Sequence, residues 1–169
     1  MTNLKDKIQN NGAWYYEQLD LGFNYRITDI QCALGLAQFK RLDKFISKRH
    51  EIAKYYNNRF KDLDIVTPYQ SPDAYSALHL YPIQVTDARE RKNVFEHLRA
   101  NNIGVNVLYI PVYLQAYYQK LGFSEGLCPE AEKYYARSIS LPMYPKLINK
   151  QIEYVVEKVK EATISYSFS

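Results

Sequence analysis

A short loop that leads into a helical pattern carries most of the chemistry in this sequence. Asn24 and Arg26, one neutral hydrogen-bond donor and one fixed cation, lie just ahead of Thr28-Asp29-Ile30-Gln31. A threonine followed three residues later by a glutamine is typical of a capping box, which begins a helix. The free amide groups and positive dipole end of that helix then lie beside Asn24 and Arg26. We therefore predict that this loop binds an anion.

The other reactive side chains form no catalytic or metal-binding pattern. His50, His79 and His97 lack metal-ligand spacing, and we expect His50 and His97 on polar helix faces. His79 lies in a strand-like run between leucines and is the histidine that we expect to face a cleft, with a hydrogen-bonded structural role as the alternative. The sequence has no nucleophilic triad and no glycine-rich phosphate loop. By itself the chain predicts no complete active site and no metal site.

The composition is that of a folded domain with no nucleic-acid or membrane role. The chain has 169 residues, of which 47% are hydrophobic, and its 17 tyrosines indicate partly wet contact surfaces. Its net charge of +4 is far smaller than the concentrated positive charge that is typical of a nucleic-acid-binding protein. No apolar run is long enough to span a bilayer. Cys32 and Cys128 lack metal or disulfide-scaffold spacing, and no secretory signal follows Met1. We therefore expect reduced thiols and a cytoplasmic protein.

The elements that must position these residues begin with a long helix. From Thr28 to about Phe60 the apolar residues recur mostly at three- and four-residue steps, which predicts one continuous helix with a single buried face. Such a helix measures about 45 Å, which is more than a compact domain of this size needs for itself. We expect its basic residues on the solvated face; they are Lys40, Arg41, Lys44, Lys48 and Arg49.

Short strands follow the long helix. The pattern predicts strands over residues 65–67, 78–85 and 105–110. Because Pro82 cannot donate to a strand ladder, we expect the second strand to be an edge strand or to carry a bulge.

Further helices alternate with these strands. Asp87-Ala88-Arg89-Glu90 is a second capping-box pattern and predicts a helix through about Ala100 with Val94, Phe95 and Leu98 inward. The remaining predicted helices cover 113–121, ended by Gly122, then 129–138, begun by Pro129, and a last one capped by Asn149, with Ile152, Val155, Val156 and Val159 on one side. This order predicts an α+β fold with a small mixed or antiparallel sheet.

Four segments of the chain resemble a known enzyme family. They are Gly22–Gln31 with Ala33–Phe39, His79–Ile83, Ile103–Pro111 and Ser140–Tyr144. In this order they are similar to the DegT-type (DnrJ/StrS-like) sugar aminotransferases, which use pyridoxal phosphate (PLP) to aminate nucleotide-linked keto sugars. The resemblance spans residues 1–162 and is strongest to the branch that makes the 4-amino sugar intermediate of pseudaminic acid.

The resemblance implies the C-terminal half of a fold-type I aminotransferase. Residues 1–27 would then be the end of the large domain with the cofactor-phosphate loop, 28–60 the connecting helix, and 61–169 the small α+β domain. The family's asparagine in this loop reaches across a homodimer to the cofactor phosphate of the other subunit. Asn24 matches it, and Arg26 lies beside it.

The resemblance also implies where the substrate is held. The family's small domain contacts the nucleotide sugar through the segment that matches Asn106 to Gln115, with Asn106, Tyr109, Tyr113 and Gln115 as the candidate residues here. His79, the histidine expected to face a cleft, is a further substrate candidate. Partly buried packing is the alternative role for the tyrosines and Gln115. The sequence departs from the family pattern at Leu108 and Tyr113, where histidines are usual, so the sugar specificity is open.

The groups that complete the family's chemistry belong to its N-terminal half. These are the Schiff-base lysine, the aspartate that pairs with the pyridine nitrogen, and the aromatic residue that stacks on the ring. We expect the chain alone to be inactive, either truncated ahead of Met1 or a partner of a separately encoded N-terminal half. The complete enzyme would move an amino group, usually from glutamate, onto a 4-keto sugar.

Two other functions are open for this chain. One is a PLP-dependent deoxysugar dehydratase of the same fold, in which a histidine replaces the lysine. The other is a non-catalytic domain that dimerises through the long helix and the tyrosine-rich surface.

Overall fold

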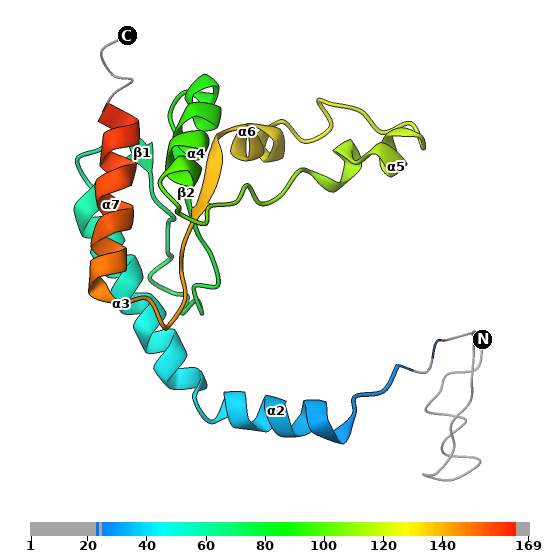
Figure 1. Cartoon of the computed structure of the whole chain (residues 1–169). Helices are drawn as coiled ribbons and strands as arrows, with labels where there is room; N and C mark the ends of the chain where they lie inside the picture. Colours follow the sequence, from blue (N-terminus) through cyan, green and yellow to red (C-terminus); the bar gives the residue numbers. More distant parts are fainter. Residues whose placement is uncertain (1–22, 24, 165–169) are drawn as a thin grey trace. The chain divides into compact units, whose positions relative to one another are not determined.

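The computed structural model describes residue 23 and residues 25–164. The chain forms two compact units, Met1–Lys40 and Arg41–Ser169 (Figure 1). Asn24 lies outside the described residues.

The described helix of the first unit is α2 (Asp29–Phe39), and its start confirms the predicted capping box. The Gln31 amide donates to the Thr28 hydroxyl at 3.3 Å, and the Thr28 amide donates to Gln31 Oε1 at 2.9 Å. Two early amide groups are thereby satisfied within four residues of sequence. No residue of α2 is buried, and its large apolar side chains are exposed; they are Ile30, Leu34, Leu36 and Phe39.

The prediction of one continuous helix from Thr28 to Phe60 is wrong. After α2 the chain makes a turn at Lys40 and Arg41, and α3 (Leu42–Phe60) begins there. Arg41 has φ −109° and ψ 2°, which is not helical and interrupts the ladder of i to i−4 hydrogen bonds. Neither residue of the turn is a glycine or a proline, so the sequence contains no helix-breaking residue at this point. The spacing of the apolar residues also continues across it.

The second unit contains a three-stranded antiparallel sheet. Its strands are β1 (Ile65–Val66), β2 (Tyr81–Val85) and β3 (Ser138–Leu141), in the order β1-β2-β3. This confirms the α+β prediction with an antiparallel sheet. The prediction of a strand over 105–110 is wrong, because this segment forms only one isolated β-bridge, between Asn106 and Ser140. All four residues of β3 are buried, and no strand was predicted there from the sequence.

Pro82 lies in the central strand, so the prediction of an edge strand is wrong. Ser140 exchanges both of its backbone hydrogen bonds with Asn106 and therefore points its amide and carbonyl away from Pro82, its partner across the β2–β3 pair. The nitrogen of Pro82 faces the β1 side, where pairing reaches only Gln84 and Val85. The missing N–H is tolerated because β1 ends before it comes opposite Pro82.

The helices of the second unit follow the predicted order. The turn η1 (Ala88–Glu90) and α4 (Arg91–Ala100) cover the second capping-box helix, with the Asp87 carboxylate accepting from the Arg89 amide. The predicted aromatic helix is divided into η2 (Val112–Leu114) and α5 (Ala116–Gln119). The last two are α6 (Pro129–Arg137), with its proline in the first turn, and α7 (Asn149–Ile164).

The core of the second unit forms between the sheet and α3, α4 and α7. In Figure 1, α7 lies beside α3 and α4, and contacts join these helices. Alternate residues of β2 are buried on the core face, and Tyr81 packs against Tyr56 of α3 with ring centroids 5.0 Å apart. The inward residues predicted for α4 and α7 are confirmed; those buried are Val94, Leu98, Ile152, Val155, Val156 and Val159, and Phe95 is partly buried against them.

Candidate functional site

The loop ahead of α2 is described at Phe23 and from Tyr25 onward. The rings of Phe23 and Tyr25 stack with centroids 5.6 Å apart, and both side chains are exposed. Arg26 is also exposed, two residues before the N-cap Thr28. A guanidinium group close in sequence to a helix N-terminus is chemically suited to a phosphate. The anion site itself stays a prediction, since Asn24 lies outside the described residues.

The segment from Asn106 to Gln115 passes from the β3 bridge into η2. The Asn106 side chain accepts from the Val107 amide at 2.8 Å, so its carboxamide oxygen is turned to its own backbone. Tyr109 has 70% of its surface exposed. Gln115 is exposed and is the residue between η2 and α5. Of the candidate residues in this segment, Asn106, Tyr109 and Gln115 are exposed, whereas Tyr113 is partly buried.

Tyr113 lies at the centre of a hydrogen-bonded cluster with α6 and the loop before it. Its hydroxyl donates to Glu132 Oε1 at 2.6 Å and accepts from the Cys128 amide at 3.2 Å. The same Glu132 oxygen accepts from the Gly126 amide at 2.8 Å. Loss of solvent and the bond to Glu132 raise the pKa of Tyr113 to about 12. The bond from Tyr113 also lowers the pKa of Glu132, because it stabilises the carboxylate.

His79 is exposed and lines a pocket of about 490 Å³ beside α3. Its backbone carbonyl accepts a hydrogen bond from Arg49 at 2.9 Å. None of the residues from Asn106 to Gln115 lines this pocket, so the described chain does not gather all the predicted substrate residues in one cavity. The lining residues are Leu42, Phe45, Ile46, Arg49, Ala77, His79, Tyr144, Pro145 and Lys146.

The prediction that Arg49 lies on the solvated face of the helix is wrong, because its side chain binds backbone carbonyls of other segments. Its Nη1 atom lies 3.0 Å from the Leu78 carbonyl, 2.9 Å from that of His79 and 2.7 Å from that of Met143. One guanidinium group thus joins α3 to the segment before β2 and to the segment after β3. A sequence pattern could not reveal this, because the acceptors are backbone carbonyls 29 to 94 residues away.

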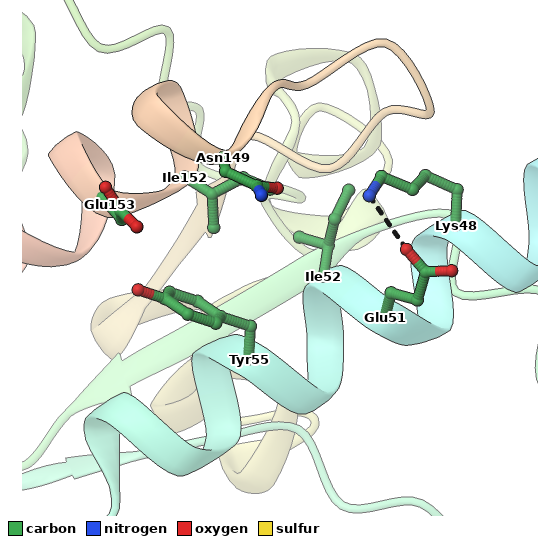
Figure 2. Close-up of a pocket in the computed structure, with 7 residues that line it drawn as sticks. All are labelled: Lys48, Glu51, Ile52, Tyr55, Asn149, Ile152 and Glu153. Atoms are coloured by element: carbon green, nitrogen blue, oxygen red, sulfur yellow. Dashed lines mark hydrogen bonds and ion pairs between the residues drawn. The ribbon is translucent and has the colours of Figure 1, made fainter.

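A smaller pocket of about 200 Å³ lies between α3 and α7, and none of the predicted site residues lines it. Figure 2 shows Ile52 and Tyr55 of α3 facing the residues at the start of α7, with Lys48 and Glu51 joined at one end. The Lys48–Glu51 pair has an N–O distance of 2.8 Å. We interpret this pocket as a packing gap between α3 and α7, with polar side chains at its ends.

No group of three or more histidines, cysteines, aspartates or glutamates in residues 23 and 25–164 is placed to hold a metal ion. Over the same residues, no helix has the length and apolar character needed to cross a membrane.

Comparison with known proteins gives consistent matches along the chain. Residues 3–160 match the model of the DegT/DnrJ/EryC1/StrS aminotransferase family. The spore coat polysaccharide biosynthesis protein SpsC of Bacillus subtilis is 38% identical over an alignment of 162 residues, and this alignment covers 92% of this chain and 42% of SpsC. The UDP-4-amino-4,6-dideoxy-N-acetyl-beta-L-altrosamine transaminase of Campylobacter jejuni is 34% identical over an alignment of 164 residues, which covers 91% of this chain and 43% of that protein.

Solved structures give the same result for the fold. PseC of Helicobacter pylori, an aminotransferase involved in pseudoaminic acid biosynthesis, aligns with a TM-score of 0.80 at 29% identity, over 96% of this chain and 46% of that one. The PLP form of Spr1654 from Streptococcus pneumoniae aligns with a TM-score of 0.82 at 28% identity, over 90% of this chain and 40% of that one. The chain thus corresponds to less than half the length of these proteins. With its motif order, its α+β fold and this match over residues 3–160, the chain belongs to the DegT/DnrJ/EryC1/StrS aminotransferase family.

Proposed function

We propose that this chain is the C-terminal portion of a PLP-dependent aminotransferase that aminates a nucleotide-linked 4-keto sugar. The observation that carries the proposal is the family match over residues 3–160, together with the fold shared with the PLP form of Spr1654. SpsC is named for spore coat polysaccharide biosynthesis, and the Campylobacter protein is named as the transaminase of a UDP-linked amino sugar. These names support a sugar made for a cell-surface or other glycan, and the pseudaminic acid branch is our preferred assignment. Glutamate is the proposed amino donor.

The proposed cofactor residues are Asn24 and Arg26. When bound, PLP supplies the electron sink that amino-group transfer requires. The residues of this chain would hold its phosphate: Arg26 as a cation, Asn24 as a neutral donor, and the capped start of α2 through its dipole. We propose that this site completes the cofactor pocket of a second subunit in a homodimer.

The proposed substrate residues are Asn106, Tyr109, Tyr113, Gln115 and His79. The exposed side chains of Tyr109 and Gln115 support direct contact with a sugar or nucleotide phosphate. The Tyr113 hydroxyl is bonded to Glu132, so we infer that its first role is to hold the segment that carries the other two.

We further propose that residues 1–169 do not catalyse transamination without the family's N-terminal half. No lysine of the chain lies in the lysine motif that family members use for the Schiff base, and a covalent link to the cofactor is central to that chemistry. The proposal includes a cytoplasmic location, where free thiols such as Cys32 and Cys128 stay reduced.

A chimera tests these proposals. The chain replaces the segment of SpsC that it matches, so that the rest of SpsC supplies the family's N-terminal half. We expect the chimera to show the visible absorbance of enzyme-bound PLP and to aminate a UDP-linked 4-keto sugar with glutamate, whereas the chain alone does neither. A folded, dimeric chimera that neither binds PLP nor aminates the sugar would contradict the proposed function.

A further inference from the structure

Two adjoining pockets form one groove along the first turns of α3. One is the pocket of about 490 Å³ that contains His79, and the other has a volume of about 480 Å³. Both are lined by Phe45, Pro145 and Lys146, so the two pockets adjoin at these residues. We call the two together the α3 groove; all its lining residues belong to the unit Arg41–Ser169.

The floor of the α3 groove is apolar and partly open to solvent. Leu42, Phe45 and Ile46 lie at helical i, i+3 and i+4 spacing on one face of α3. Leu42 keeps 42% of its surface exposed, whereas Ile52, farther along α3, is buried in the core. The apolar face of α3 thus continues past the core into the groove, where Pro145 forms part of the opposite wall.

The rim of the α3 groove is cationic. Arg41, Lys44 and Lys146 are exposed, and the Arg41 guanidinium lies 5.5 Å from the centre of the Phe45 ring. Among the lining residues of both pockets the one carboxylate is Glu51, and Lys48 pairs with it at 2.8 Å, as Figure 2 shows. The lining residues therefore leave a net positive charge beside an apolar surface.

We propose that the α3 groove binds an amphipathic helix whose flanks carry acidic side chains. An apolar strip with helical spacing accepts the apolar face of a second helix, and cations along the rim meet carboxylates on both sides of that face. A small anion would instead require donors that converge on one point. Here the cations line the edge of the groove, and Arg49 directs one guanidinium nitrogen to three backbone carbonyls. Because His79 lines the groove and is also a proposed substrate residue, a bound helix and a nucleotide sugar that contacts His79 would compete for this surface.

A binding experiment with the full chain tests this occupant. The probe is a fluorescein-labelled peptide of about 16 residues, roughly four helical turns, with leucines at i, i+3, i+4 and i+7 and glutamates on both flanks. One control peptide has lysine in place of each glutamate, and another has the same composition in an order without helical periodicity. We expect saturable binding of the acidic amphipathic peptide, weakened by added salt, and at least tenfold weaker binding of both controls.

A matched pair of double variants locates the site. Lys44→Glu with Lys146→Glu reverses two rim charges, and we expect at least fivefold weaker peptide binding, since each reversal replaces an attraction to the peptide's glutamates with a repulsion. Lys54→Glu with Lys120→Glu reverses two exposed charges outside the groove and should leave the affinity unchanged. Circular dichroism checks that both variants fold.

Three results would overturn the proposal. The first is equal binding of the acidic and basic peptides, and the second is an affinity that the rim variant does not change. The third is binding of inorganic pyrophosphate that depends on Lys44 and Lys146 while the acidic peptide fails to bind, since this would make the groove a small-anion site.

Discussion

The phenol of Tyr113 and the carboxylate of Glu132 are joined by a 2.6 Å hydrogen bond that connects η2 to α6. The Gly126 amide donates to the same carboxylate oxygen, and the Cys128 amide donates to the phenol oxygen. One residue pair therefore holds the loop between α5 and α6 and the end of the segment that begins at Asn106. This relationship gives two predictions with opposite dependence on pH.

Replacement of Glu132 by glutamine should weaken the fold in a pH-dependent way. Glu132 has a pKa below its ordinary value of 4.5 because Tyr113 donates to the carboxylate. A lowered folded-state pKa means that the stabilisation is present above the unfolded-state pKa and is lost as pH falls through the folded-state value. The stability difference between the wild-type chain and Glu132→Gln should be largest near neutral pH and shrink below about pH 4.5. Urea unfolding at several pH values measures it, and a difference that stays constant on acidification contradicts the assignment.

The phenol of Tyr113 should ionise at a higher pH than that of an ordinary tyrosine. Burial and the Glu132 carboxylate raise its pKa to about 12 from an ordinary value of 10.0. The raised value means that its stabilising contribution is complete below the unfolded-state pKa and is lost as pH rises through about 12. The difference between the phenolate absorbance titrations of the wild-type chain and of Tyr113→Phe isolates this group. Glu132→Gln should move the pKa of Tyr113 part of the way back toward 10.0. A difference curve centred near pH 10 for the wild-type chain would show that the Tyr113–Glu132 pair does not persist in solution.

Arg49→Met should lower the free energy of unfolding by about 1–3 kcal/mol. The substitution keeps the apolar stem of the side chain and removes the donor that serves the Leu78, His79 and Met143 carbonyls. Urea unfolding followed by circular dichroism measures the loss. Lys54→Met removes a cation from an exposed position of the same helix and should change stability by less than about 0.5 kcal/mol. Equal effects of the two substitutions would show that the carbonyl contacts contribute nothing.

Truncation of one isoleucine in each unit should change the free energy of unfolding by very different amounts. Ile139 of β3 is 0% exposed, and Ile139→Ala should cost about 2–5 kcal/mol because it leaves a cavity in the core. Ile30 of α2 is 76% exposed, so in this chain Ile30→Ala should cost less than about 0.5 kcal/mol. Thermal or urea unfolding of both variants tests the contrast. A large loss for Ile30→Ala would mean that α2 is covered in solution, as a dimer interface would require.

Thr28→Ala should shorten or fray α2 without loosening the second unit. The Thr28 hydroxyl accepts from the Gln31 amide, and loss of such an N-cap costs about 1 kcal/mol. Backbone chemical shifts of residues in the first turn of α2 measure the local loss, while the shifts of β2 and α7 should stay unchanged. Thr28→Ser keeps the hydroxyl and is the matched control; it should retain the first turn.

The sequence by itself determined the features that depend on neighbours in the chain. The capping box at Thr28, the proline that opens α6 and the inward faces of α4 and α7 were all predicted, because their contacts or periodicities lie within one or two helical turns. The ordered motifs also identified the family, which the match over residues 3–160 confirmed. The α+β class followed from the alternation of these local patterns.

Only the tertiary structure decided the order of the strands and the partners of the key side chains. The burial of β3 and the tolerance of Pro82 depend on how far β1 and the Asn106 bridge extend along the sheet. Arg49 reaches Met143 across 94 positions, and Tyr113 reaches Glu132 across 19. Contacts of this kind are set by packing of the whole unit, since the periodicity of an element shows which face is apolar but not what that face or its opposite will meet.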